Sequence, residues 1–321
     1  MEASGCKVPT SDNSSLSSII FLVFSALEAL VGMGLNALIA VVSCTHGMKN
    51  RQLKCVDKIL TALGVSRFCQ LSIFIVKIIW MTISSTNFEM TRMYHLVKGT
   101  IWFLTSICFN FSACLCFFYC VKIANFRHRL FIHLKMEISR LVPWMLLVSV
   151  FASLANTFPF FHGLYSITCK NNTGYGTSGN QTLEDLTLET NLVYLFVFCG
   201  TGFSVAFSMS ITLSGLLLFS LWRHTHLMQN GSTSFSDLSM AAHFKAVKTI
   251  MLLLIVDSVN FVGLMILLSN RFSERTPINQ LVTIVVFVCP TVQSQIMIWG
   301  NPKLKKAFTR VIDCIRHMFL V

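Results

Sequence analysis

Four charged residues interrupt long apolar stretches of this sequence: Glu28, Arg67, Lys77 and Asp257. A charged side chain in an apolar medium costs several kcal/mol unless a partner or water replaces its lost solvation. Each of the four therefore needs an opposite charge, a hydrogen-bond network or a bound ligand. Asp257 could hold a ligand amine, to which Trp102 would add a cation–π contact, or it could be protonated and hydrogen-bond its neighbours.

Polar residues recur at helical spacing around these charges. Glu28, Gly32 and Asn36 are four residues apart, so they share one face of a helix, and that face must point away from lipid. For Asn36 and Arg67 we favour polar contact between helices over contact with a ligand. The residues expected to hold the helices together are Glu28, Asn36, Arg67, Lys77, Ser294, Asn301 and Pro302.

A second set of residues could line a ligand cavity. Trp102, Ser106 and Asn110 form one stripe at helical spacing, and Asp257, Asn260 and Leu264 form another. Any one of these positions could equally be a packing position, but together they favour a pocket. The predicted ligand-binding residues are Trp102, Phe103, Ser106, Asn110, Asp257, Asn260, Leu264, Thr283 and Phe287.

The sequence contains no pattern typical of catalysis or of metal binding. The histidine pairs at 128 and 133 and at 224 and 226 do not have the repeated spacing of membrane metalloenzymes, and carboxylates are scarce near them. Nucleophile-elbow, phosphate-loop and zinc-protease motifs are absent. We therefore expect no catalytic residue, no metal and no cofactor.

The elements that position these residues are membrane helices. Hydrophobic residues make up 54% of the 321 residues and charged residues only 12%, and the mean hydropathy is +0.68. An average soluble domain carries about a quarter charged residues, so the main solvent here is lipid. The net charge of +12 lies in short runs between apolar segments, which argues against a nucleic-acid partner.

Seven apolar windows are long enough to cross a bilayer, which needs about 20 residues per helix. They predict an all-α membrane protein, a seven-transmembrane helix bundle followed by a short amphipathic surface helix. Its expected parts are a tail at 1–16, a helical domain at 17–299 and a C-terminal helix at 300–321. The seven windows are 17–43, 58–83, 96–121, 141–163, 191–222, 247–269 and 277–299.

Positive charge predicts how the bundle is oriented. With the N-terminus outside, seventeen Lys and Arg residues fall on the inner side and six on the outer side, as the positive-inside rule requires. The outer side then holds sequons at Asn171 and Asn180, the predicted glycosylation sites. It also holds Cys6 and Cys169, which could form a bridge. The first span is expected to serve as the targeting signal, because residues 1–18 lack the features of a secretory signal.

Five segments at the inner ends of the spans resemble the type 2 (bitter) taste receptors, a family of seven-helix G-protein-coupled receptors. The resemblance covers most of the chain. The matching segments are 56–63 with Ser66 and Arg67, 118–126, 219–225 with Met228 and Gln229, His243 with 245–249, and 300–305.

The resemblance implies a receptor that binds small bitter, amphipathic molecules and activates a gustducin-type heterotrimeric G protein. Asp257 adds amines as a possible class of ligand. It places Trp102 and Ser106 in the ligand pocket and Tyr119, Lys122, His224 and Lys248 at the G-protein surface. It also suggests that Asn36 and Arg67 lie level, which puts Glu28 and Lys77 at similar depths and predicts that they approach each other. The chain departs from the family at Asp257, where a tyrosine is frequent, and at Gln293, where a histidine is usual.

The expected partners are thus small-molecule agonists, a cytoplasmic G protein and the lipid bilayer, and the expected location is the plasma membrane. One alternative is a receptor of the related type 1 vomeronasal family, disfavoured by the segments at 122–125 and 302–304. The other is a small-solute transporter with Glu28, Arg67 and Asp257 as a relay. It is disfavoured because the chain shows no inverted repeats.

Overall fold

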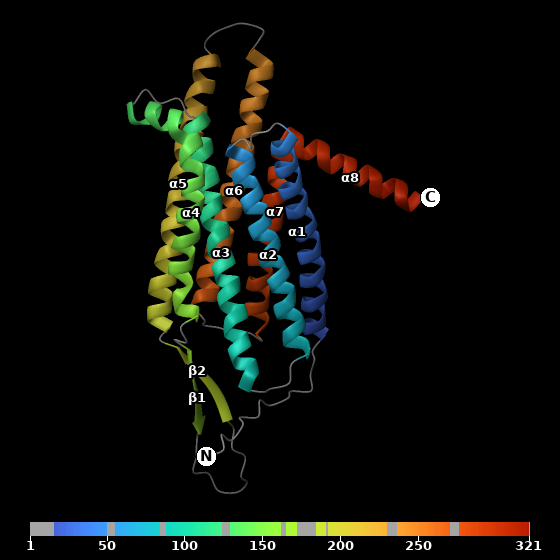
Figure 1. The fold of residues 1–321 in the computed structure, drawn as a ribbon, viewed down its shortest axis with the longest axis vertical. Coiled ribbons are helices and arrows are strands. Elements are labelled where there is room, and N and C mark those ends of the chain that lie inside the picture. Colours follow the sequence, from blue (N-terminus) through green and yellow to red (C-terminus); the bar gives the residue numbers. More distant parts are fainter. Residues whose placement is uncertain are drawn as a thin grey trace.

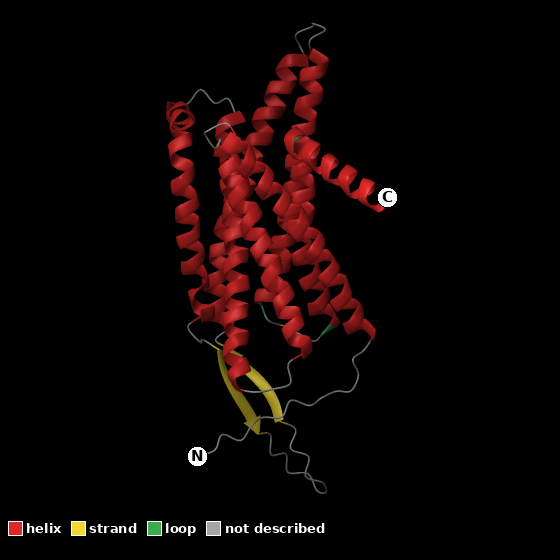
Figure 2. Cartoon of the chain, turned by 45° about the vertical axis from the view of Figure 1, so that its right-hand side comes forward, coloured by secondary structure: helices red, strands yellow, loops and turns green. Residues whose placement is uncertain are grey.

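A computed structural model describes most of the chain, namely residues 16–49, 55–83, 88–123, 129–161, 165–171, 184–190, 192–229, 236–269 and 276–320. These residues form eight helices and one strand pair (Figures 1 and 2). The helices are α1 (Leu16–Lys49), α2 (Cys55–Ile83), α3 (Phe88–Ile123), α4 (Arg129–Phe161), α5 (Leu192–Gln229), α6 (Ser236–Leu268), α7 (Pro277–Gly300) and α8 (Pro302–Leu320). The strands are β1 (Tyr165–Asn171) and β2 (Glu184–Thr190).

Seven of the helices, α1 to α7, are long and apolar enough to cross a membrane. The predicted seven-helix fold with a C-terminal helix is therefore confirmed. Most window limits agree with the apolar spans of these helices to within a few residues, although α3, α5 and α6 extend beyond their spans. The fourth does not, because its apolar stretch begins at Phe131 rather than at 141. The basic residues Lys135 and Arg140, which suggested a loop there, belong to the first half of α4, and the first turns of this helix project at an angle from the bundle (Figure 1).

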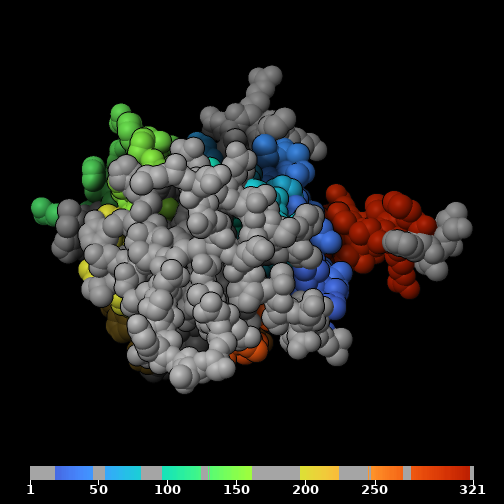
Figure 3. Space-filling model, turned by 90° about the horizontal axis from the view of Figure 1, so that it is seen from below, coloured from blue at the N-terminus to red at the C-terminus, as the bar shows by residue number. Residues whose placement is uncertain are grey.

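The helices form one elongated bundle in which α3 is central. It packs against α2, α4 and α5, while α7 packs against α1 and α6 (Figure 1). At one end α8 leaves the bundle sideways, and at the other end the β1–β2 hairpin lies beyond the helices (Figure 2). We call these the α8 end and the hairpin end. The view onto the hairpin end shows α8 extending past the outline of the bundle (Figure 3).

The strand pair was not predicted. β1 and β2 are antiparallel, with Tyr165 opposite Thr190 and Asn171 opposite Glu184. Both strands lie in the long loop between the fourth and fifth windows, where they alternate apolar with polar residues too briefly to distinguish a strand from a loop. The hairpin adds no strand to the membrane part of the fold, which is entirely helical among the described residues.

Side chains accept backbone hydrogen bonds at both ends of α7. Thr276 caps the start of α7, where its hydroxyl accepts a hydrogen bond from the backbone N–H of Asn279. At the other end of α7 the Asn301 side chain accepts a bond from the Lys303 N–H at 3.1 Å, and Pro302 begins α8. The predicted break at Asn301 and Pro302 is therefore present, and it points α8 away from the bundle axis.

Candidate functional site

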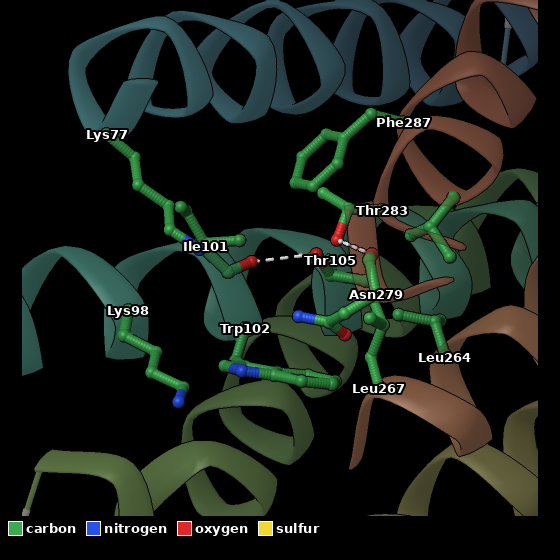
Figure 4. A pocket seen from close by; sticks show the side chains of 11 residues that line it. Lys77, Lys98, Ile101, Trp102, Thr105, Leu264, Leu267, Asn279, Thr283 and Phe287 are labelled. Carbon is green, nitrogen blue, oxygen red and sulfur yellow. Dashed lines mark hydrogen bonds between the residues drawn. The ribbon is translucent and has the colours of Figure 1, made fainter. Parts of the chain in front are cut away.

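A cavity lies between α2, α3, α6 and α7 towards the hairpin end, with ≈ 620 Å³ of empty space, part of it open to solvent (Figure 4). We call it the aromatic cavity. Its lining residues are Lys77, Lys98, Ile101, Trp102, Thr105, Leu264, Leu267, Asn279, Thr283, Val286 and Phe287.

Stacked rings hold the two aromatic walls of this cavity in place. The Trp102 ring stacks on Phe160 of α4 with centroids 5.1 Å apart, and it also contacts Phe203 of α5 at 5.9 Å. On the other side the Phe287 ring stacks on Phe74 of α2 at 3.6 Å. Because each ring has a packed partner behind it, the cavity offers fixed apolar surfaces to a ligand.

The polar groups of the cavity are mainly hydrogen-bond donors and cations. Lys77 and Lys98 point into it from α2 and α3, and the Asn279 amide faces it from α7 (Figure 4). The Thr283 hydroxyl already donates to the backbone carbonyl of Asn279 at 2.8 Å. None of the described lining residues carries a carboxyl group. The polar groups that the described lining residues add to the aromatic walls are therefore hydrogen-bond donors and cations rather than carboxylates.

A second, smaller cavity lies deeper in the bundle and has ≈ 250 Å³ of empty space. We call it the polar chamber. Its lining residues are Arg67, Gln70, Thr105, Cys108, Phe109, Ser112, Asp257, Asn260, Pro290 and Gln293. Thr105 lines both cavities, so the polar chamber lies next to the aromatic cavity, on the side away from the hairpin end.

Arg67 is the centre of a hydrogen-bond network in this region, and its side chain is only 2% exposed. One terminal nitrogen, Nη1, donates to Ser294 Oγ at 3.3 Å. The other, Nη2, donates to Ser112 Oγ at 3.3 Å and to the Gln293 Oε1 atom. Gln293 in turn donates from Nε2 to Asp257 Oδ1 at 2.6 Å. Gln293 thus bridges the two buried charges, Arg67 on α2 and Asp257 on α6.

The network extends to α1 through Asn36, which is completely buried. Ser294 Oγ donates to Asn36 Oδ1 at 2.8 Å, and Asn36 Nδ2 donates to the Gly32 carbonyl at 2.8 Å. One turn further along α1, Glu28 Oε1 accepts a 2.5 Å bond from Thr291 of α7. The face of α1 that carries Glu28, Gly32 and Asn36 therefore points into the bundle, as its spacing predicted.

The structure separates the nine predicted ligand-binding residues into three groups. Trp102, Leu264, Thr283 and Phe287 line the aromatic cavity, and Asp257 and Asn260 line the polar chamber. The remaining three, Phe103, Ser106 and Asn110, line neither cavity.

These three side chains have partners elsewhere in the bundle. Phe103 packs on the cluster around Ile107 and Leu115, Ser106 Oγ accepts a bond from Asn156 Nδ2 at 3.5 Å, and Asn110 Nδ2 donates to Ser153 at 2.9 Å. The stripe of residues four apart drifts around α3 and turns from the cavity towards α4, since 3.6 residues complete a turn.

Lys77 was predicted to help hold the helices together, but the structure places it at the aromatic cavity. It lines the aromatic cavity, whereas Glu28 does not line it and bonds to Thr291. The predicted approach of Glu28 and Lys77 assumed that both side chains face the boundary between α1 and α2. The structure directs Glu28 towards α7 and Lys77 towards α3, because each lies on a different face of its helix (Figure 4).

The residues predicted at the G-protein surface lie towards the α8 end. The Lys122 ammonium lies over the Phe118 ring, 5.4 Å from its centroid, and the ring of Tyr119 contacts the same phenylalanine edge-on at 6.0 Å. Lys248 is exposed on α6, and His224 lies on α5 in a segment whose side chains fall outside the description. Of the predicted glycosylation sites, Asn171 ends β1 and Asn180 lies outside the described residues, as does Cys6.

Several lining residues escaped prediction. Lys98 and Asn279 lie near the start of their apolar spans, where polar residues are ordinary. Gln70 and Gln293 are uncharged and resemble any polar contact within a bundle. A helical projection of α2 could have revealed Gln70, which lies one turn from Arg67. No group of three His, Cys, Asp or Glu residues suited to a metal ion occurs within the described ranges.

A bundle of seven apolar helices, with a cavity near one end and a polar network across its middle, is the architecture of a seven-helix membrane receptor. Comparison with known proteins agrees. Residues 14–316 match the family described as taste receptor protein (TAS2R). The chain therefore belongs to the type 2 (bitter) taste receptors, a family of seven-helix G-protein-coupled receptors that are not enzymes.

Individual relatives match over nearly their whole length. The chain is 34% identical to taste receptor type 2 member 40 of Gallus gallus over 94% of this chain and 98% of the relative. It is also 34% identical to member 39 of Homo sapiens, over 91% and 87% of the two chains. Identity to member 7 of Rattus norvegicus is 32%, over 92% and 96%. These matches favour the taste-receptor interpretation over the vomeronasal and transporter alternatives.

Proposed function

We propose that this protein binds small amphipathic molecules in the aromatic cavity and, when they bind, activates a gustducin-type heterotrimeric G protein at its α8 end. The observation that carries this proposal is the aromatic cavity itself, which joins α3 to α6 and α7. A ligand that contacts both α3 and α6 can change the relative stability of two arrangements of the bundle.

The proposed ligands are acids or strong hydrogen-bond acceptors attached to an aromatic body. Trp102 and Phe287 provide apolar walls for the body, and Lys77 and Lys98 provide positive charge beside them (Figure 4). A ligand amine was one of the two partners considered for Asp257. That carboxyl group lies in the polar chamber and accepts a hydrogen bond from Gln293, so it does not supply a counter-charge within the aromatic cavity.

The proposed orientation places the α8 end in the cytoplasm and the hairpin end outside. The support is the positive-inside distribution of Lys and Arg, because helix ends with Lys49, Lys122 and Arg223 are on the same side as α8. This orientation exposes the aromatic cavity towards the outside and Tyr119, Lys122, His224 and Lys248 towards a cytoplasmic G protein. A plasma-membrane location follows from the same proposal.

The test uses pairs of compounds with the same apolar body in cells that express the receptor and a promiscuous G protein, with intracellular calcium as the readout. We expect 4-phenylbutyric acid to activate at lower concentration than 4-phenylbutylamine. Lys98→Gln should raise the half-maximal concentration of acids about tenfold, the effect of losing one charge-assisted hydrogen bond.

A matched control removes a lysine far from the cavity. Lys306→Gln on α8 should leave the half-maximal concentrations of both compounds within about twofold, since screened surface charges contribute little. Amines more potent than acids would overturn the proposed ligand class. A receptor present at the cell surface that answers no compound of a broad bitter library would overturn the proposed function itself.

A further inference from the structure

The polar chamber contains three buried polar atoms that have no hydrogen-bond partner within the described part of the chain. They are Nε of Arg67, Oε1 of Gln70 and Oδ1 of Asn260. All three side chains line the chamber, and their exposed fractions are 2%, 1% and 6%. Groups buried in this way are nearly always satisfied by protein, water or ligand, so this trio marks a place where something else binds.

The neighbouring bonds fix what each atom can accept or donate. The Thr105 hydroxyl donates its proton to the Ile101 carbonyl at 2.8 Å, so it can only accept from Gln70, whose Nε2 lies 2.9 Å away. The Gln70 amide is therefore oriented with its oxygen free. Both terminal nitrogens of Arg67 already have partners, which leaves the Nε–H group. The chamber thus offers one donor and two acceptors.

The charges around the chamber favour a neutral occupant. Arg67 and Asp257 both line it, and Gln293 bonds to both, so a bound cation or anion would face one attractive and one repulsive group. The apolar contribution to the wall comes mainly from Phe109 and Pro290. A small neutral group with one acceptor and two donors fits this arrangement best.

The chamber is within reach of a ligand in the aromatic cavity. Thr105 lines both spaces, and on α6 Asn260 lies about one helical turn, roughly 6 Å, from Leu264 of the aromatic cavity. One agonist of ordinary size can therefore place an aromatic body between Trp102 and Phe287 and a polar end in the chamber.

We infer that the polar chamber is an agonist subsite for a primary carboxamide or urea, an inference that rests on the proposed receptor function. The carbonyl oxygen of the agonist accepts from the Arg67 Nε–H, and its NH₂ group donates to Gln70 and Asn260. Without agonist, one water molecule satisfies the same three groups and is displaced on binding. Esters and tertiary amides lack the two N–H donors, so they leave the side-chain carbonyl oxygens of Gln70 and Asn260 without a partner.

The test compares para-substituted benzamides and phenylureas with their N,N-dimethyl analogues, using calcium responses at matched surface expression. In the wild type we expect the primary compounds to be at least about tenfold more potent, because two buried acceptors discriminate against a group that cannot donate. Asn260→Leu and Gln70→Met should each reduce this preference to about threefold or less.

Asn279→Leu is the matched control, because it is the same Asn→Leu change as Asn260→Leu but in the aromatic cavity. It should shift the half-maximal concentrations of both analogues by the same factor. Apparent melting temperatures of all variants identify any that fold poorly. If one of the two chamber variants, Asn260→Leu or Gln70→Met, does not fold, the other still tests the subsite. Equal potency of primary and dimethyl compounds in the wild type, or no response to either while other library agonists act, would overturn the subsite. Silence towards the whole library would instead contradict the receptor proposal.

Discussion

At the scale of single residues, the main feature is that one buried arginine holds together several helices. Arg67 of α2 reaches Ser112 on α3 and Ser294 and Gln293 on α7, and Gln293 carries the connection to Asp257 on α6. A buried charge is tolerated when its neighbours accept its hydrogen bonds, and here three polar oxygens do so. Within this network, the Gln293 amide is the connection to α6.

The Gln293–Asp257 bond is expected to stabilise the bundle measurably. Gln293→Leu and Asp257→Leu should each lower the apparent melting temperature of the solubilised receptor, and the double variant should lose less than the two single losses combined. The expected coupling is about 1–3 kcal/mol, because either single change leaves the other polar group buried without its partner. Gln293→Leu combined with Asn110→Leu, whose partner Ser153 is on α4, should be additive. Additivity in the Asp257 pair as well would refute the bridge.

Sequence reasoning could identify these buried residues but not their partners. The cost of burying a charge singles out Arg67 and Asp257 from the sequence alone, and the structure adds that Gln293 joins them. That pairing depends on how α2, α6 and α7 rotate about their axes, and the apolar surfaces of these helices are too uniform to determine it. The same reason explains why Phe103, Ser106 and Asn110 lie outside the cavity although they share α3 with Trp102.

At the scale of elements, close helix contact depends on one small residue between α1 and α2. A Cβ atom on Gly64 would lie 2.9 Å from the Asn36 carbonyl oxygen and 3.2 Å from the Ala40 Cβ atom. The first of these is backbone, so α1 as a whole would have to move. A Cβ atom on Gly34 of α1 would meet no other atom within 4 Å, so the two helical glycines differ in their surroundings.

This contrast gives a matched pair of substitutions. Gly64→Ala should destabilise the receptor by about 1–3 kcal/mol through overpacking. Gly34→Ala should be neutral or stabilise it by up to about 1 kcal/mol, since alanine is the better helix former. Apparent melting temperatures measured with a thiol-reactive dye or by ligand-independent aggregation would test both. A Gly64→Ala receptor as stable as the wild type would mean that α1 and α2 are further apart than the structure has them.

The C-terminal helix α8 is expected to lie on the membrane surface. Among the residues of α8 whose side chains the structure describes, only Leu304 is buried. Val311, Ile312 and Ile315 are between 43% and 47% exposed and form an apolar stripe that lipid would cover. In inside-out membrane vesicles and a Cys314→Ser background, Ile315→Cys should react at least about fivefold more slowly with a membrane-impermeant thiol reagent than Asp313→Cys on the opposite face. Equal rates at both positions would indicate that α8 stands free in water.

At the scale of the whole molecule, composition and hydropathy were enough to predict the architecture. Seven apolar windows correspond to seven helices, because a bilayer permits few other ways to satisfy backbone hydrogen bonds. The β1–β2 hairpin and the early start of α4 were not predictable in the same way, since water and lipid headgroups tolerate loop, strand or helix alike.

The orientation of the molecule predicts where sugar is attached. With the hairpin end outside, glycosidase treatment should increase the gel mobility of the wild-type receptor but not that of an Asn171→Gln, Asn180→Gln double variant. The wild type and the double variant would behave alike if the loop were cytoplasmic, because glycosyl transfer takes place in the secretory lumen.

The most direct test of the account compares two neighbouring aromatic residues of α3. Trp102 lines the aromatic cavity, while Phe103, the next residue, packs away from it on the cluster around Ile107 and Leu115. The measurement is the half-maximal agonist concentration for the calcium response, at matched surface expression. We predict that Trp102→Ala raises it about tenfold or more, as expected for loss of an aromatic contact to the ligand, and that Phe103→Ala changes it less than about threefold. An unchanged response in Trp102→Ala, or equal losses in both variants, would contradict the claim that agonists bind in this cavity.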